Sequence, residues 1–246
     1  MDRLVYTAMT GAKHIMEKQA NVTHNLANVS TNGFRAQVDS FRAVPVINDG
    51  LATRTFVVDS TIGTDFGQGP MQQTGRNLDV AIQGKGWIAV QMDDGSEAYT
   101  RNGSLKLSEN GQLQTRTGLS VLGDGGPIGI PPDVNISIGG DGTISAVDAG
   151  SKPGQGTVLG RIKLVNPAEE TLVRGDDGMF RVKDGNAADA DATVRVVGGS
   201  LEGSNVSVVD SMVNMISLAR QFEMHMSLLK NAESNAAKAS QILALS

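Results

Sequence analysis

The sequence predicts an α+β protein in which long N- and C-terminal helices pair as an antiparallel coiled-coil stalk beside a central antiparallel β-rich domain. Helical apolar periodicity occurs near both ends of the 246-residue chain. Between these ends, short apolar runs alternate with Asp-Gly and Asn-Gly dipeptides, which favour tight turns between antiparallel strands. Thirty glycines and only nine aromatic residues (one Trp, two Tyr and six Phe) agree with a turn-rich centre.

These patterns divide the chain into three expected parts. Residues 1–33 and 203–246 form a discontinuous terminal-helix stalk domain, and residues 70–202 form a β-rich outer domain. Residues 34–69 lack a clear periodicity, and we expect them to form an extended connector.

The first helix is expected from about residue 3 to residue 31. It carries apolar side chains at alternating steps of three and four residues, with Gln19 as the one polar interruption, and Asn32-Gly33 supplies a stop that tolerates positive φ. The row consists of Val5, Ala8, Ala12, Ile15, Val22, Leu26 and Val29.

The last helix is expected from about residue 206 to residue 243. Ser207, three residues before Asp210, resembles a capping box at its start. Its expected apolar row begins at Val208 and continues through Met212, Met215, Ala219, Phe222, Met226 and Leu229.

Burial favours assembly of these helices with other molecules. Ordering a residue costs about 1–2 kcal/mol of backbone entropy, whereas burying a medium apolar side chain returns roughly 1.5–3 kcal/mol, at about two such positions per heptad. A two-helix hairpin covers only one side of each helix, so we expect both rows, from Val5 to Val29 and from Met212 to Leu229, to form an assembly interface. The alternative is that both helices fold back onto the β-rich domain as an ordinary α+β core.

Composition argues against catalysis and against nucleic-acid binding. The chain has no cysteine, and its three histidines, His14, His24 and His225, all lie in the expected helices. A nucleophilic triad or a zinc site is therefore not expected in the β-rich part, and we expect no enzyme activity, no cofactor and no metal. The acidic pairs and glycine-rich runs are interpreted as turns. A net charge of −5 gives no basis for phosphate binding.

The N-terminus has no basic region followed by a continuous apolar stretch, so we expect no cleaved signal peptide. The chain also contains no apolar stretch long enough to span a membrane.

Three blocks resemble the flagellar rod and hook protein family. The first is Asn25–Arg35 (NLANVSTNGFR), the second is Thr74–Trp87 (TGRNLDVAIQGKGW), and the third comprises 202–206 (EGSNV), 212–216 (MVNMI) and 220–223 (RQFE). The residues that carry the family motif are Asn25, Leu26, Ala27, Asn28, Thr31, Gly33, Phe34, Asn205, Asn214 and Glu223.

The resemblance implies a structural subunit of the basal-body rod, a helical polymer that serves as the drive shaft for motility. It also implies export by the flagellar type III apparatus without a cleaved signal, location in the periplasm-spanning rod, and partnership with copies of the chain and with other proximal and distal rod subunits. Length and the short connector favour a proximal-rod type. The alternatives are a distal-rod type or a non-flagellar β-domain that binds a ligand.

Overall fold

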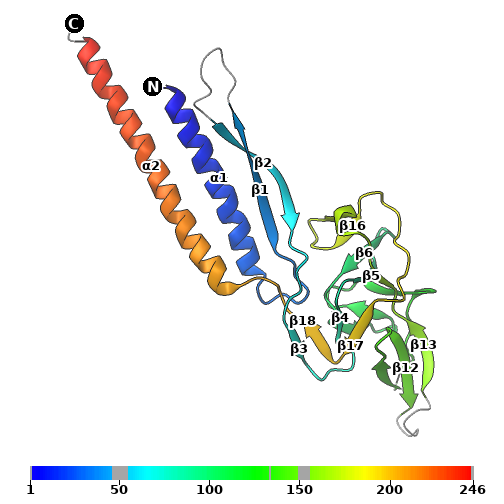
Figure 1. Cartoon of the computed structure of the whole chain (residues 1–246). Coiled ribbons are helices and arrows are strands. Elements are labelled where there is room, and N and C mark those ends of the chain that lie inside the picture. The colour runs from blue at the N-terminus through cyan, green and yellow to red at the C-terminus, as the bar shows by residue number, and fades with distance from the viewer. Residues whose placement is uncertain (1, 46–54, 133, 149–155, 245–246) are drawn as a thin grey trace. The chain divides into compact units, whose positions relative to one another are not determined.

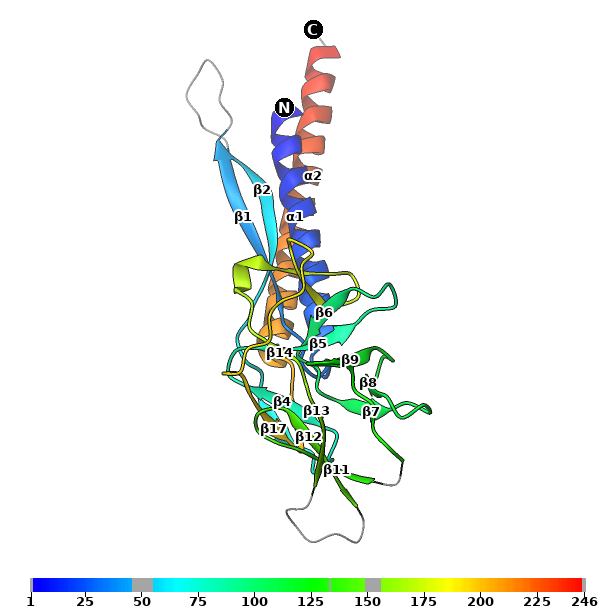
Figure 2. The same cartoon turned by 90° about the vertical axis from the view of Figure 1, so that its right-hand side faces the viewer.

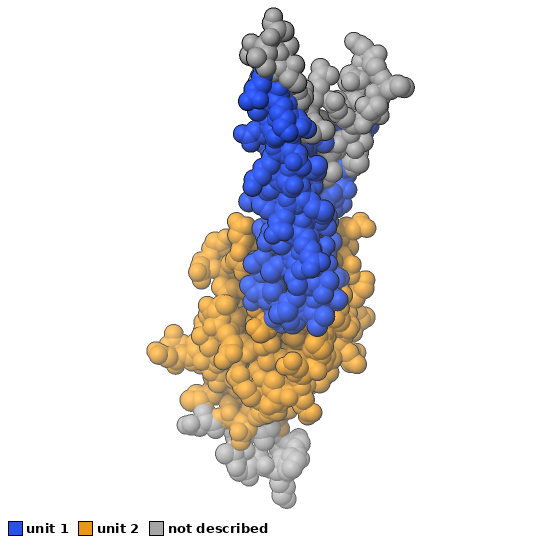
Figure 3. Space-filling view, turned by 90° about the vertical axis from the view of Figure 1, so that its left-hand side faces the viewer, with its two compact units in different colours: residues 1–29, 36–65, 206–246 blue, residues 30–35, 66–205 orange. Residues whose placement is uncertain are grey.

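A computed structural model describes residues 2–45, 55–132, 134–148 and 156–244, and the chain forms two compact units within it. Unit 1 contains residues 1–29, 36–65 and 206–246, and unit 2 contains residues 30–35 and 66–205 (Figure 3).

Unit 1 consists of two helices and a β-hairpin. Helices α1 and α2 lie side by side and antiparallel, and the hairpin of β1 and β2 packs along α1 (Figure 1). The bounds are Asp2–Ala27 for α1, Gln37–Pro45 for β1, Thr55–Thr64 for β2 and Val208–Ala244 for α2.

The start of α2 follows the capping signal of the sequence, whereas the end of α1 does not follow the expected stop. The backbone N–H of Asp210 donates to Ser207 Oγ over 3.3 Å, so Ser207 caps α2. Helix α1 ends at Ala27, and residues 28–33 form turns. Gly33 has φ +69°, but it lies six residues beyond the end of the helix.

The α+β class and the β-rich centre are present, but the expected antiparallel coiled-coil stalk is wrong. Two features of unit 1 overturn it. Helix α1 has a β-hairpin as a second neighbour: the ring of Phe41 in β1 packs edge-on against His14 with centroids 5.7 Å apart. In addition, Met212, Ala219 and Met226 of the expected α2 row are exposed.

Both strands of the hairpin lie within the expected connector, residues 34–69. Residues 37–45 and 55–64 pair antiparallel, with an irregularity between Ser40 and Phe41, and residues 46–54 lie outside the described part of the chain. Lys18 of α1 places its Nζ 4.4 Å from the centroid of the Phe41 ring, which gives the hairpin a cation–π contact with the helix.

Unit 2 is built from antiparallel strands (Figure 2). Its largest sheet has the order β15-β16-β6-β5-β9-β8-β7, with β10 beside β9 and β14 beside β5; a three-stranded sheet has the order β11-β12-β13, and two further pairs are β17-β4 and β18-β3. The strand bounds are β3 Met71–Gln73, β4 Val80–Gln83, β5 Trp87–Gln91, β6 Glu97–Thr100, β7 Leu105–Leu107, β8 Leu113–Thr115, β9 Ser120–Gly123, β10 Gly126–Pro127, β11 Val134–Ile138, β12 Thr143–Asp148, β13 Thr157–Arg161, β14 Leu164–Val165, β15 Leu172–Arg174, β16 Phe180–Val182, β17 Arg195–Gly198 and β18 Ser200–Glu202; a 3-10 turn spans Glu169–Thr171.

Strand β5 is buried on both faces, which explains its unbroken apolar run. Successive side chains of a strand point to opposite faces, so Trp87 and Ala89 join one cluster while Ile88 and Val90 join the other. Phe180 packs on Trp87 with ring centroids 4.5 Å apart. Unit 2 therefore has a layered core with β5 in its middle.

The Asp-Gly dipeptides close tight turns in unit 2, as the sequence predicts. In the turn between β5 and β6, Gly95 adopts φ +81° and the Asp94 carboxylate accepts the backbone N–H of Ser96 over 2.8 Å. The hydroxyl of Ser96 donates to the same oxygen, and this bond is the main cause that lowers the pKa of Asp94.

Candidate assembly surface

Most side chains of the apolar row expected on α1 are buried or half-buried inside unit 1. Ala8, Ala12 and Ile15 are buried, while Val5 is exposed. The C-terminal part of the row is half-buried, at Val22, Leu26 and Val29. Most of these side chains therefore contact other parts of the same chain, which leaves the opposite face of α1 outward.

On α2 the buried row is offset from the expected one. Leu218 and Ala232 are buried, and they lie at the same angular position as Ser211 and His225 because steps of seven residues return to one helix face. Met215, Phe222 and Leu229, the other half of this row, were expected and are half-buried. The structure therefore brings together only three of the six expected α2 interface residues on the inner face.

A close approach between the helices explains why the inner row of α2 includes a histidine. A Cβ built on Gly11 of α1 would lie 2.6 Å from Cε1 of His225. Glycine at position 11 therefore leaves room for the imidazole ring, and any larger residue would force the ring away.

The outer face of α2 is apolar over its first half. Met212, Val213 and Ile216 are 50%, 59% and 57% exposed. A shallow groove of about 380 Å³ is lined here by Val213, Ile216, Ser217, Arg220, Gln221 and Met224. Helix α1 has exposed apolar side chains of its own at Tyr6, Met9 and Met16. These side chains lack cover within the described residues of unit 1.

A polar pocket of about 440 Å³ lies between the C-terminal part of α1, the start of β1 and the N-terminal part of α2. Two motif residues line it, Asn25 from α1 and Asn214 from α2. Asn25 Nδ2 donates to the carbonyl of Gln37 over 2.8 Å, and the N–H of Gln37 donates back to Asn25 Oδ1 over 2.9 Å. The Asn25 amide thus pairs with the backbone at the start of β1 and fixes the hairpin to the helix.

The motif residues Thr31, Gly33 and Phe34 belong to unit 2. The φ of +69° at Gly33 brings its backbone against residues 101 and 102, where a Cβ would lie 2.4 Å from the carbonyl carbon of Arg101. Phe34 is buried, and the guanidinium of Arg174 stacks over its ring at 4.5 Å. This explains the glycine and the aromatic residue of the motif by close packing.

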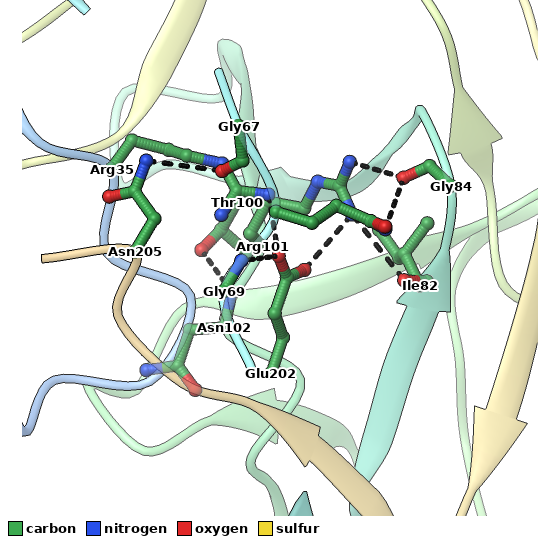
Figure 4. A network of polar contacts seen from close by, with 11 residues as sticks. Arg35, Gly67, Gly69, Ile82, Gly84, Thr100, Arg101, Asn102, Glu202 and Asn205 are labelled. Atoms are coloured by element: carbon green, nitrogen blue, oxygen red, sulfur yellow. Dashed lines mark hydrogen bonds and ion pairs between the residues drawn. The ribbon is translucent and has the colours of Figure 1, made fainter. Parts of the chain in front are cut away.

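The third block meets the first through a buried ionic network (Figure 4). Glu202 Oε1 accepts from Arg35 Nη2 over 2.7 Å and from the N–H of Gly69 over 3.0 Å. Glu202 Oε2 accepts from Arg101 Nη1 over 3.0 Å. Asn205, the next motif residue, donates from Nδ2 to the carbonyl of Gly67 over 3.1 Å.

Burial sets the electrostatics of this network. The side chains of Arg35, Arg101 and Glu202 are at most 4% exposed. Loss of solvent lowers the pKa of Arg101 to about 10, while the charge of Glu202 opposes this change and that of Arg35 adds to it. Two cations thus share one carboxylate.

The remaining motif residues have simpler roles. Asn28 Nδ2 donates to the His24 carbonyl over 2.9 Å at the end of α1. Ala27, Thr31 and Glu223 are exposed, and the carbonyl of Thr31 accepts the backbone N–H of Phe34 over 3.3 Å.

Arg101 was not predicted from the sequence, and Arg35 and Glu202 stood out only as parts of the family-like blocks. Glu202 is the one charged residue of β18, between Leu201 and a glycine, and its strand is fully buried. A charge in a fully buried strand requires partners, which is the physical reason for the network.

Neither a metal site nor a membrane helix is evident in the described part of the chain. No group of three or more His, Cys, Asp or Glu residues is placed there to hold a metal ion. Of the helices described, none combines the length and apolar content that crossing a bilayer requires.

Two family models match the chain. Residues 81–146 match the flagellar hook protein FlgE/F/G D1 domain, and residues 197–242 match the C-terminal domain of the flagellar basal-body rod FlgEFG proteins.

Full-length relatives agree with these matches. The chain is 47% identical to the flagellar basal-body rod protein FlgF of Escherichia coli K12 and 45% identical to FlgF of Salmonella typhimurium LT2, each over 252 aligned residues that cover 100% of both chains. FlgG of Bacillus subtilis 168 is 31% identical over 256 aligned residues, covering 95% of this chain and 96% of the relative. The chain therefore belongs to the FlgF-like flagellar basal-body rod proteins and is a structural subunit of that rod.

Proposed function

We propose that this subunit polymerises through the outward faces of its terminal helices, with the apolar first half of α2 as the main contact. The supporting observation is the group of exposed side chains on that face, above all Met212, Val213 and Ile216. Contiguous apolar surface of this kind is uncommon on monomeric proteins and marks sites of association.

The proposal divides the expected interface residues into two groups. Ala8, Ala12, Ile15, Met215 and Phe222 hold unit 1 together, and Val22, Leu26, Val29 and Leu229 assist them. Val5, Met212, Ala219 and Met226 remain accessible and serve contacts with neighbouring subunits. A contact surface on one side of a helix whose other side is buried needs no unfolding before assembly.

The partners in this proposal are copies of the chain and the other proximal and distal rod proteins. The subunit reaches the periplasm-spanning rod through the flagellar type III export apparatus, without a cleaved signal peptide, and acts without catalysis. Membership of a rod family supports the partners, since rod subunits assemble with one another.

A matched pair of charge substitutions on α2 tests the assembly surface. Ile216→Asp places a carboxylate in the apolar part of the outer face, where burial against a neighbour would cost several kcal/mol. Ser234→Asp places the same charge eighteen residues further along, at the same angular position after about five helical turns. Ser234 is exposed and follows Glu233, so its carboxylate should be tolerated.

The assay is swimming motility and recovery of basal bodies from a strain that lacks its own copy of this gene. Ile216→Asp should abolish both while leaving the circular dichroism of the purified protein unchanged, and Ser234→Asp should support both. Normal rods with Ile216→Asp, or equal failure of the two variants, would refute the proposed surface.

Complementation separates the proximal-rod assignment from the distal-rod alternative. We expect the chain to restore motility to an E. coli strain without FlgF and to leave a strain without FlgG non-motile. The opposite pattern would reassign the subunit to the distal rod.

A further inference from the structure

The chain crosses between unit 1 and unit 2 at four places, after residues 29, 35, 65 and 205. Next to three of these crossings, those after residues 35, 65 and 205, short segments of unit 2 contact one another. The segments concerned are 33–35, 67–69 and 202–205 (Figure 4).

Glu202 contacts the other two segments directly. Its carboxylate accepts from Arg35 and from the N–H of Gly69, and its backbone carbonyl accepts the N–H of Gly33 over 2.8 Å. Around this centre, the N–H of Asn205 donates to the Phe34 carbonyl over 3.4 Å.

Arg101 anchors the carboxylate to the body of unit 2. While Nη1 donates to Glu202, Nη2 donates to the carbonyl of Gly84 over 2.6 Å, and Gly84 directly follows strand β4. The three segments are therefore tied through one carboxylate to the β-sheet core.

We propose that Glu202 is a positioning residue that fastens the three chain segments where unit 2 continues into unit 1, so that they open together when its charge is removed. Nothing in this inference depends on assembly, because it concerns unit 2 of a single chain. Removing one partner of a buried ion pair leaves the other charges uncompensated, which makes Glu202 the sensitive member of the network.

Glu202→Gln tests the inference with little change in volume. A carboxylate accepts on both oxygens, whereas the amide has one accepting atom and one donating atom, so either Arg35 or Arg101 loses its partner. Glu97→Gln is the matched control: Glu97 is also in unit 2 and pairs with Lys163 over 2.8 Å, but it contacts none of the three segments.

The readout is native-state hydrogen exchange, residue by residue, on the full-length monomer at low concentration. In Glu202→Gln the amides of Gly33, Gly69 and Asn205 should exchange at least tenfold faster. The amides of Ala89 and Leu113, which are bonded within the sheet body, should keep their rates. Glu97→Gln should leave all five rates unchanged.

Two outcomes would overturn the inference. Equal acceleration at Ala89 and Leu113 would make Glu202 a general stabilising residue, and unchanged rates at Gly33 and Asn205 would show that the segments are held without it.

A milder pair of variants carries the test if Glu202→Gln does not fold. Arg35→Lys keeps the charge but loses the planar fork, and the three segment amides should again exchange faster than in the control Arg181→Lys. Protection equal to that of the control would refute the role of the network.

Discussion

Replacing Gly33 by alanine should destabilise unit 2 far more than the same replacement at Gly95. Both glycines have positive φ, +69° and +81°, so alanine meets a backbone cost of roughly 1–2 kcal/mol at either site. Reduced entropy of the unfolded chain returns about 0.4–1 kcal/mol in both cases. At Gly95 a new Cβ has open space, and the net loss should be about 1 kcal/mol.

At Gly33 the new Cβ would also lie 2.4 Å from the carbonyl carbon of Arg101. This atom is backbone, so the segment must move. Overpacking costs about 1–3 kcal/mol, and a lost bond from the Gly33 N–H to the Glu202 carbonyl costs about 1 kcal/mol more. Gly33→Ala should therefore lower the free energy of unfolding by about 3 kcal/mol or more.

Urea unfolding followed by tryptophan fluorescence measures this difference. Trp87 is the single tryptophan and is 4% exposed in the core of unit 2, so its emission reports on this unit. With a slope of about 2 kcal/mol per molar urea, the midpoint should fall by about 1.5 M for Gly33→Ala and by about 0.5 M for Gly95→Ala. Equal midpoints for the two variants would refute the argument that Gly33 is required by close packing.

Two further predictions concern helix packing and acid stability. Leu218→Ala should destabilise unit 1 by about 2–3 kcal/mol because it empties a buried position, whereas Met212→Ala should change the stability of unit 1 by less than about 0.5 kcal/mol. Urea unfolding followed by circular dichroism at 222 nm compares the two variants, and equal effects would contradict the assigned inner face of α2. Unit 2 should lose stability as pH falls below about 4, because hydrogen bonds to their carboxylates lower the folded-state pKa of four turn residues below the unfolded value. The stabilisation is complete above the unfolded pKa and disappears as pH falls through the folded pKa. The urea midpoint followed by Trp87 fluorescence should therefore be lower at pH 3 than at pH 5, and the difference should be smaller in Asp141→Asn. A midpoint that does not fall would exclude this contribution. The four residues are Asp94, Asp141, Asp177 and Asp191.

The helices and the turn-rich β centre could be predicted from local patterns. Three- and four-residue spacing identified both helices, Ser207 marked the start of α2, and dipeptides such as Asp94-Gly95 marked hairpin turns. Each of these signals lies within a few residues, where the backbone itself relates sequence to geometry.

The inner face of α2 could not be predicted in the same way. Apolar residues occupy several sides of this helix, so periodicity alone does not select the side that faces α1. The inner row includes Ser211 and His225, which carry no apolar signal, and the ring of His225 fits because Gly11 lies opposite it. The more apolar Met212 and Ile216 face outward.

The ionic network could not be predicted from local patterns either, because its residues lie far apart in the sequence. Arg35 and Glu202 are 167 residues apart, and Arg101 and Glu202 are 101 residues apart. No short-range pattern links such positions, and the pairing of β18 with β3 sets Glu202 opposite Met71, close in sequence to its third partner, Gly69.

The contact between Asn205 and Gly67 has a consequence for how this family varies. Most of unit 2 is one continuous stretch, residues 66–205, placed within the sequence of unit 1. Its entry and exit are held within one hydrogen bond of each other, at 3.1 Å. A domain with adjacent ends can be enlarged, trimmed or replaced by another domain without disturbing the host. Evolution and engineering can therefore exchange the stretch 66–205 of such a subunit while the helices of unit 1 stay the same.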